Sequence, residues 1–141
     1  MARDMHARTI PLLLLLLLAA PSAVADGIAL IGHEALPKTD LGLIRRLYTG
    51  KVVEIRGIPV TPVNLPTGHP VRTRFLTSFL GQDEEHYTGY WTVRRFVGLG
   101  SPPKELRTRA EVIEYVRANP GAIGYVDADD LPAGVNILQQ R

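Results

Sequence analysis

The sequence predicts an α/β layer architecture, because segments typical of strands and of helices alternate along it. Short continuous apolar runs at residues 28–31 and 122–126 are typical of buried strands. Between them, apolar residues recur at helical spacing in 41–48, 70–80 and 112–116. Alternation of the two kinds of segment is the pattern of domains in which helices pack on a sheet.

The first strand and helix lie within residues 27–50. The strand is the apolar run 28–31, which Gly32 and a turn-like stretch follow. Thr39 or Asp40 can cap the next helix, because either side-chain oxygen can accept a hydrogen bond from an unpaired backbone N–H. Gly50 ends that helix. Its apolar face consists of Leu41, Ile44, Leu47 and Tyr48.

A second strand and helix follow in the same order. Residues 60–63 form a short extended segment, and two prolines in or beside it indicate an edge or an irregular end. A loop at 64–68 leads to Pro70, which suits the first position of a helix. We expect this helix to end at Gly81. Its apolar stripe consists of Val71, Phe75, Leu76, Phe79 and Leu80.

Acidic residues at 83–85 favour the start of a short helix, since negative charge compensates the dipole there. Tyr87, Tyr90 and Trp91 would face inward from it. Residues 98–103 contain two glycines and two prolines, so we expect a loop.

The last helix carries the strongest local signal in the chain. Thr108 and Glu111 have the spacing of a capping box, and Asn119–Pro120 stops the helix. Two short strands, 122–126 and 135–138, follow around a turn. The buried face of the helix consists of Val112, Ile113 and Val116.

The N-terminus has the pattern of a secretory signal peptide. Two arginines precede an apolar stretch at 10–20, which is shorter than the roughly 20 residues of a membrane-spanning helix. Ala23 and Ala25 form a small-residue cleavage site. We expect residues 1–25 to be removed and residues 26–141 to form one periplasmic or secreted domain without stable membrane insertion. A retained N-terminal anchor is the alternative.

Composition excludes several classes of function. The chain has no cysteine, which rules out disulfides, thiol nucleophiles and zinc–thiolate sites. Its 16 Lys and Arg face 14 Asp and Glu, for a net charge of +2. Basic residues do not gather in a stripe with interleaved aromatics, so we expect no nucleic-acid partner.

No catalytic, metal or cofactor motif is present. After cleavage the serines are Ser78 and Ser101, and neither lies in a G-x-S-x-G turn. The acidic cluster at 127–130 lacks the longer pattern of a calcium loop, and the glycines at 98–100 are followed by prolines where a dinucleotide-binding turn needs a helix. We therefore expect a protein that is not an enzyme. Metal-site spacing is also missing among His33, His69 and His86.

The loop at 66–70 is the best candidate for ligand binding. It leads from a strand end into a helix N-terminus, where unpaired backbone N–H groups and the helix dipole favour an anion. Arg72 and Arg74 follow one turn inside the helix. The alternative is an ordinary loop with surface arginines. The candidate anion site consists of Thr67, Gly68, His69 and Arg72.

Several motifs together resemble a known family. Residues 43–51, LIRRLYTGK, resemble the L-x-x-I-F-x-G-K segment of phosphate-type ABC transporter solute-binding proteins. The string NPGAIGYV at 119–126 is the most specific match. The matches keep the order of the family and cover nearly all of the expected exported chain. They also include Pro62–Asn64, Phe75–Leu76 and Tyr90–Trp91.

The resemblance implies the fold of one lobe of a type 2 periplasmic binding protein, a mixed sheet flanked by helices. Members of the family have two lobes with the ligand between them, and this chain is similar to the second lobe. The other lobe, which supplies several phosphate ligands in the family, has no counterpart here. The resemblance therefore transfers fold better than function.

The remaining half of the family's phosphate site is also altered. The family's R-x-x-G-S-G-T loop matches this chain at Gly68, but its arginine, serine, glycine and threonine would fall on Leu65, His69, Pro70 and Val71. We expect a module with a degenerate site for phosphate or another small anion and weak binding. Its partner would be an ABC permease or another envelope protein. The alternative is an envelope protein-interaction or sensory accessory domain without a small-molecule ligand.

Overall fold

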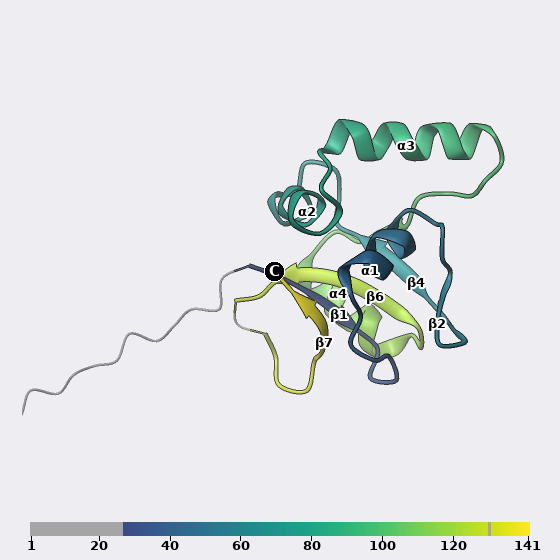
Figure 1. The fold of residues 1–141 in the computed structure, drawn as a ribbon. Helices are drawn as coiled ribbons and strands as arrows, with labels where there is room; N and C mark the ends of the chain where they lie inside the picture. Colours follow the sequence, from purple (N-terminus) through teal and green to yellow (C-terminus); the bar gives the residue numbers. More distant parts are fainter. Residues whose placement is uncertain (1–26, 130) are drawn as a thin grey trace, which may run out of the picture.

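A computed structural model describes residues 27–129 and 131–141. The expected signal peptide and its cleavage site lie outside these residues. The main sheet has five strands in the order β5-β4-β6-β1-β7. Figure 1 labels four of them, β4, β6, β1 and β7. Strand β4 is parallel to β5 and β6, whereas β1 is antiparallel to β6 and β7, so the expected mixed sheet is confirmed. The strands are β1 (Ile28–Gly32), β4 (Thr61–Asn64), β5 (Lys104–Glu105), β6 (Ala122–Asp127) and β7 (Asn136–Gln140).

Helices cover both faces of this sheet. Neighbouring residues of a strand point to opposite faces. On β6, Gly124 faces Val112 of α4, while the ring of Tyr125 stacks on Phe75 of α2 at a centroid distance of 3.9 Å. The helices are α1 (Leu41–Tyr48), α2 (Pro70–Phe75), the π-helix η1 (Leu76–Leu80), α3 (Glu84–Phe96) and α4 (Arg109–Ala118).

The helix caps follow the sequence closely. Asp40 caps α1, because its Oδ1 accepts the N–H of Leu43 at 2.9 Å. Thr108 caps α4 by accepting the N–H of Glu111 at 3.1 Å. The Glu111 carboxylate accepts in return from the N–H of Arg107, at 2.8 Å, one residue before the usual capping-box donor.

Two helices differ from expectation. The helix beginning at Pro70 changes to π geometry at Leu76 and then ends at Gly81, which adopts a left-handed φ of 66°. The predicted short helix after Asp83 is longer, since α3 runs for 13 residues. Its buried residues, Tyr87 and Trp91, belong to its first two thirds, whereas the apolar side chains of its last turn, Val93 and Phe96, are exposed.

The remaining departures are very short strands. Residues 54–55 and 58–59 form a hairpin of β2 (Glu54–Ile55) and β3 (Ile58–Pro59), and β5 adds two residues at the edge of the main sheet. A two-residue strand is too short to show alternation of polar and apolar side chains. None of the three was therefore predicted.

Candidate functional site

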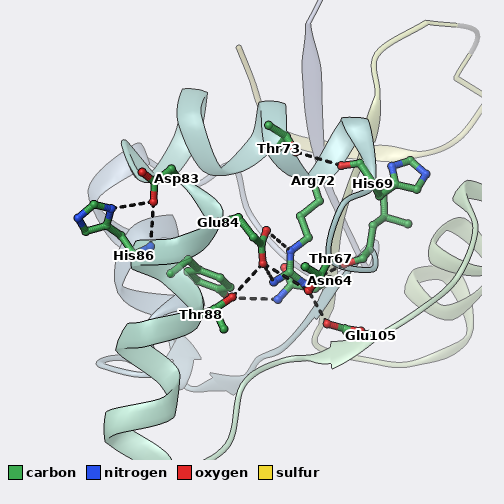
Figure 2. Close-up of polar contacts among 12 residues, drawn as sticks. Asn64, Thr67, His69, Arg72, Thr73, Asp83, Glu84, His86, Thr88 and Glu105 are labelled. Carbon is green, nitrogen blue, oxygen red and sulfur yellow. Dashed lines mark hydrogen bonds and ion pairs between the residues drawn. The ribbon is translucent and has the colours of Figure 1, made fainter.

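The candidate site lies at the carboxyl end of β4, where the loop 65–69 joins the strand to α2 (Figure 2). The first turn of α3 packs beside this loop. The structure brings Thr67 and Arg72 together around one carboxylate, that of Glu84. Gly68 forms part of the turn with a φ of 86°.

His69 has a separate, local role. It is the N-cap of α2, and its Nδ1 accepts the backbone N–H of Val71 at 3.1 Å. An accepting nitrogen cannot donate to an anion. Pro70, the first residue of the helix, has no N–H at all. The start of α2 therefore offers fewer free donors than the sequence pattern indicates.

Arg72 is almost completely buried, with 4% of its surface exposed. Its guanidinium forms a two-pronged contact with Glu84, Nε to Oε2 at 2.9 Å and Nη2 to Oε1 at 2.6 Å. Nη1 donates to the carbonyl of Leu65 and to Glu105 Oε1, each at 3.0 Å. Protein acceptors thus surround the guanidinium that we expected to face an anion.

The Glu84 carboxylate is held by more than the arginine. Its Oε1 also accepts from the hydroxyl of Thr88 at 3.0 Å and from that of Thr67 at 3.4 Å. Burial opposes ionisation of Glu84, but the hydrogen bonds and charge of Arg72 outweigh it and lower the pKa of this carboxyl. The side chain is therefore an anion at neutral pH, bound by a guanidinium and two hydroxyls.

A buried polar network fixes the start of the loop 65–69. Asn64 Nδ2 donates to the Tyr87 hydroxyl at 3.1 Å, and Asn64 Oδ1 accepts from the Tyr125 hydroxyl at 3.2 Å. The Tyr125 oxygen in turn accepts the N–H of Leu65 at 3.0 Å. Burial raises the pKa of both tyrosines, which keeps them neutral. This network fixes the position at which the chain leaves β4.

A small pocket of about 160 Å³ opens beside the Arg72 side chain. Ligand pockets for drug-sized molecules usually measure about 300–1,000 Å³, so this one suits a small ion or a few waters. Its wall includes the indole of Trp91, whose buried N–H has no hydrogen-bond partner of ordinary geometry among the described residues. Also in the wall are Asn64, Thr67, Arg72, Tyr87, Thr88, Thr92, Arg95, Pro102, Pro103 and Glu105.

Sequence reasoning missed the two carboxylates of this site. Glu84 lies in the first turn of α3, as expected, where its charge compensates the helix dipole, but it also forms an ion pair with Arg72. Glu105 comes from β5, which was not predicted. No local spacing links residues 72, 84 and 105, so only the tertiary fold could show the cluster. Arg74, the other expected arginine, pairs with Asp127 at 3.0 Å.

Two structural features bear on other kinds of function. Within residues 27–129 and 131–141, no group of three or more His, Cys, Asp or Glu side chains is placed to hold a metal ion. Across the same residues, no helix combines the length and the apolar character needed to cross a membrane.

Comparison with known proteins identifies the fold. No family model and no curated protein matches the sequence. Among solved structures, the chain is similar to a protein from Clostridium perfringens described as a phosphate ABC transporter substrate-binding protein with bound phosphate, at a TM-score of 0.61 and 23% identity. It is also similar to an ABC-type phosphate transport receptor from Vibrio cholerae, at a TM-score of 0.57 and 12% identity.

Both likenesses cover 82% of this chain but only 45% and 46% of the other two. The chain therefore shares the fold of these binding proteins over less than half of their length. The expected fold, a single lobe of the periplasmic binding protein type, is confirmed. At these identities the likeness concerns the fold alone.

Proposed function

We propose that this protein is a solute-binding-protein-like module related to phosphate ABC transporter substrate-binding proteins, with a degenerate anion site. The likeness of fold supports the relationship. One observation carries the degeneracy: the buried guanidinium of Arg72 is already bound by the carboxylates of Glu84 and Glu105. A free anion at Thr67, Gly68, His69 and Arg72 would have to compete with them.

The loop itself offers few other groups that could bind an anion in place of Arg72. Leu65 stands where the family has an arginine, and its side chain is buried. His69 Nδ1 accepts a hydrogen bond from the N–H of Val71, and the Thr67 hydroxyl donates to Glu84. Each missing neutral hydrogen bond costs about 0.5–1.5 kcal/mol and each bond to a charged group about 1.5–3 kcal/mol. The remaining affinity for phosphate should therefore be weak.

Titration calorimetry with inorganic phosphate tests this function. We expect the purified protein to bind phosphate weakly at low salt, and we expect the signal to fade at physiological salt, where the Debye length is about 8 Å. A matched titration with chloride is the control for ionic strength. Micromolar binding that does not change with salt would contradict the proposal.

We further propose that residues 1–25 direct export, and that the protein acts in the periplasm or outside the cell. The leucine-rich N-terminus and the site after Ala25 support this. The intact mass of protein from a periplasmic extract should correspond to a chain that begins at Asp26. Recovery of the full-length chain in the membrane fraction would instead indicate a retained anchor.

A second candidate function is docking to an envelope protein, such as an ABC permease, without any small ligand. An apolar cluster at the end of α3 favours it, because Phe96 is 92% exposed and its neighbours are also accessible. Figure 1 shows this end of α3 extending beyond the sheet. A photo-crosslinker at position 96 should then capture an envelope protein, whereas one at exposed Glu114 should not. The accessible neighbours of Phe96 in this apolar cluster are Val93, Val97 and Leu99.

A further inference from the structure

The contacts around Glu84 form a complete binding site for a carboxylate. Arg72 presents two parallel N–H groups to the two oxygens, at 2.9 and 2.6 Å. A fork of this kind matches the spacing of carboxylate oxygens. Thr67 and Thr88 add two hydroxyl donors from other elements, a loop and a helix. Figure 2 shows all three side chains converging on the Glu84 carboxylate.

This site is accessible from outside. Arg72, Thr67 and Thr88 all line the pocket of about 160 Å³, together with Glu105. The Glu84 side chain is 27% exposed, so solvent reaches part of it, whereas the side chain of Arg72 is 5% exposed. Removal of this side chain would leave Arg72 with one carboxylate partner, Glu105, whose side chain is 52% exposed. The three donors would then face a space that a small anion can enter.

We propose that Arg72, Thr67 and Thr88 form a carboxylate-binding site that Glu84 occupies from within the chain. A small free carboxylate, of which formate is the simplest, binds there once the Glu84 side chain is gone. This inference deepens the proposed function, because it names the group that fills the degenerate site. Its ligand class is a planar carboxylate held by a guanidinium fork and two hydroxyls.

Replacement of the side chain tests the proposal. We expect Glu84→Ala to lower the melting temperature by roughly 5–10 °C, because a buried cation loses its main partner in a small domain. Added sodium formate should restore much of this loss. Formate should bind Glu84→Ala with an apparent affinity about tenfold or more above that for the wild type, because one charge-assisted contact is recovered. Sodium chloride at equal ionic strength should restore nothing.

Two variants control for unspecific effects. Glu85 is the next residue of the same helix turn and is exposed, and its side chain has no hydrogen bond or ion pair among the described residues, so Glu85→Ala should show no formate response. Glu84→Gln removes the charge but keeps the volume of the side chain. Formate should not stabilise it, since the space remains filled. An equal response in either variant would overturn the proposal.

A third variant keeps the test independent of how well Glu84→Ala folds. Glu105→Ala removes the half-exposed partner and leaves Glu84 in place. Because the site stays occupied, formate should stabilise this variant no more than the wild type. A clear formate response here would show that Arg72 binds anions without release of Glu84, and would contradict the proposal. Failure of Glu84→Ala to fold in formate as well as in chloride would also count against it.

The outcome is separable from that of the proposed function. Tight phosphate binding by the wild type would refute the degenerate site, whatever formate does to the variants. Conversely, weak phosphate binding together with no formate rescue of folded Glu84→Ala would leave the proposed function intact and refute the occupied site.

Discussion

At the scale of single residues, the site is governed by the need to neutralise a buried arginine. An unpaired charge in a protein interior costs several kcal/mol, so Arg72 requires partners wherever the fold buries it. Burial acts to lower its pKa, but the hydrogen bond and charge of Glu84 raise the pKa above the ordinary arginine value. Arg72 therefore stays charged, and Glu84 stays ionised beside it.

This pair predicts a particular loss of stability in acid. The pKa of Glu84 is lower in the folded protein than its reference value of 4.5. Its contribution is therefore complete above pH 4.5 and is lost as the pH falls through the folded-state pKa. We expect Glu84→Gln to cost about 1–3 kcal/mol at pH 7, and the difference from the wild type to shrink below pH 4.5. Urea unfolding from pH 3 to 7 measures this.

If the free energy of unfolding depended on pH in the same way in the wild type and in Glu84→Gln, the pair would not act as described. Glu85→Gln serves as the matched control, because it removes the same charge from the same helix turn without touching Arg72. Its profile should follow the wild type throughout the acid range.

The sequence revealed part of this site. Thr67 and Arg72 could be chosen because they flank a helix start, where backbone N–H groups gather. The burial of Arg72 could not be foreseen, since arginine is mostly exposed in proteins. The partnership with Glu84 also depends on α3 folding back onto the loop, which places residues 12 positions apart in contact.

At the scale of elements, close packing around β6 explains two glycines of the NPGAIGYV string. Gly121 has a φ of 78°, and a Cβ there would collide with the carbonyl oxygen of Pro59. Gly124 lies beneath α4, where a Cβ would come within 2.6 Å of Val112 Cγ1 and 3.0 Å of Val63 Cγ2. The resemblance noted from sequence therefore marks positions at which backbone and side chains approach closely.

Two glycine substitutions should have opposite effects. Gly124→Ala should destabilise the protein by about 1–3 kcal/mol, because the added methyl overpacks the space between α4 and the sheet. Gly89, in the middle of α3, has open space within 4 Å of the position that a Cβ would take, so Gly89→Ala should stabilise by about 0.8–1 kcal/mol through helix propensity. Chemical denaturation checks both values. Equal effects of the two changes would refute the packing argument.

Elements with strong local signals were predictable and the others were not. Thr108 was identified as a cap, and Asp40 was one of two candidates beside Thr39, because a capping side chain and its target lie within three residues. Strands β2, β3 and β5 are two residues long, and β5 forms through distant pairing with β4. The length of α3 was missed because the buried residues of the helix end at Trp91, while Val93 and Phe96 of its last turn are exposed.

At the scale of the whole molecule, the likeness to known proteins concerns the fold and not the candidate site. The chain shares its fold with phosphate-binding proteins of which it covers less than half. At the carboxyl end of β4, Arg72 forms ion pairs with Glu84 and Glu105.

The most direct test of this account is the nitrogen-15 NMR signal of the Arg72 Nε–H in the wild-type protein. A guanidinium bound to Glu84 should give a signal that exchanges slowly with water, because the group is buried. We predict that millimolar phosphate leaves its position unchanged, while Glu84→Gln shifts it. A saturable shift of the wild-type signal at micromolar phosphate would show that Arg72 is available to an external anion, and would contradict the account.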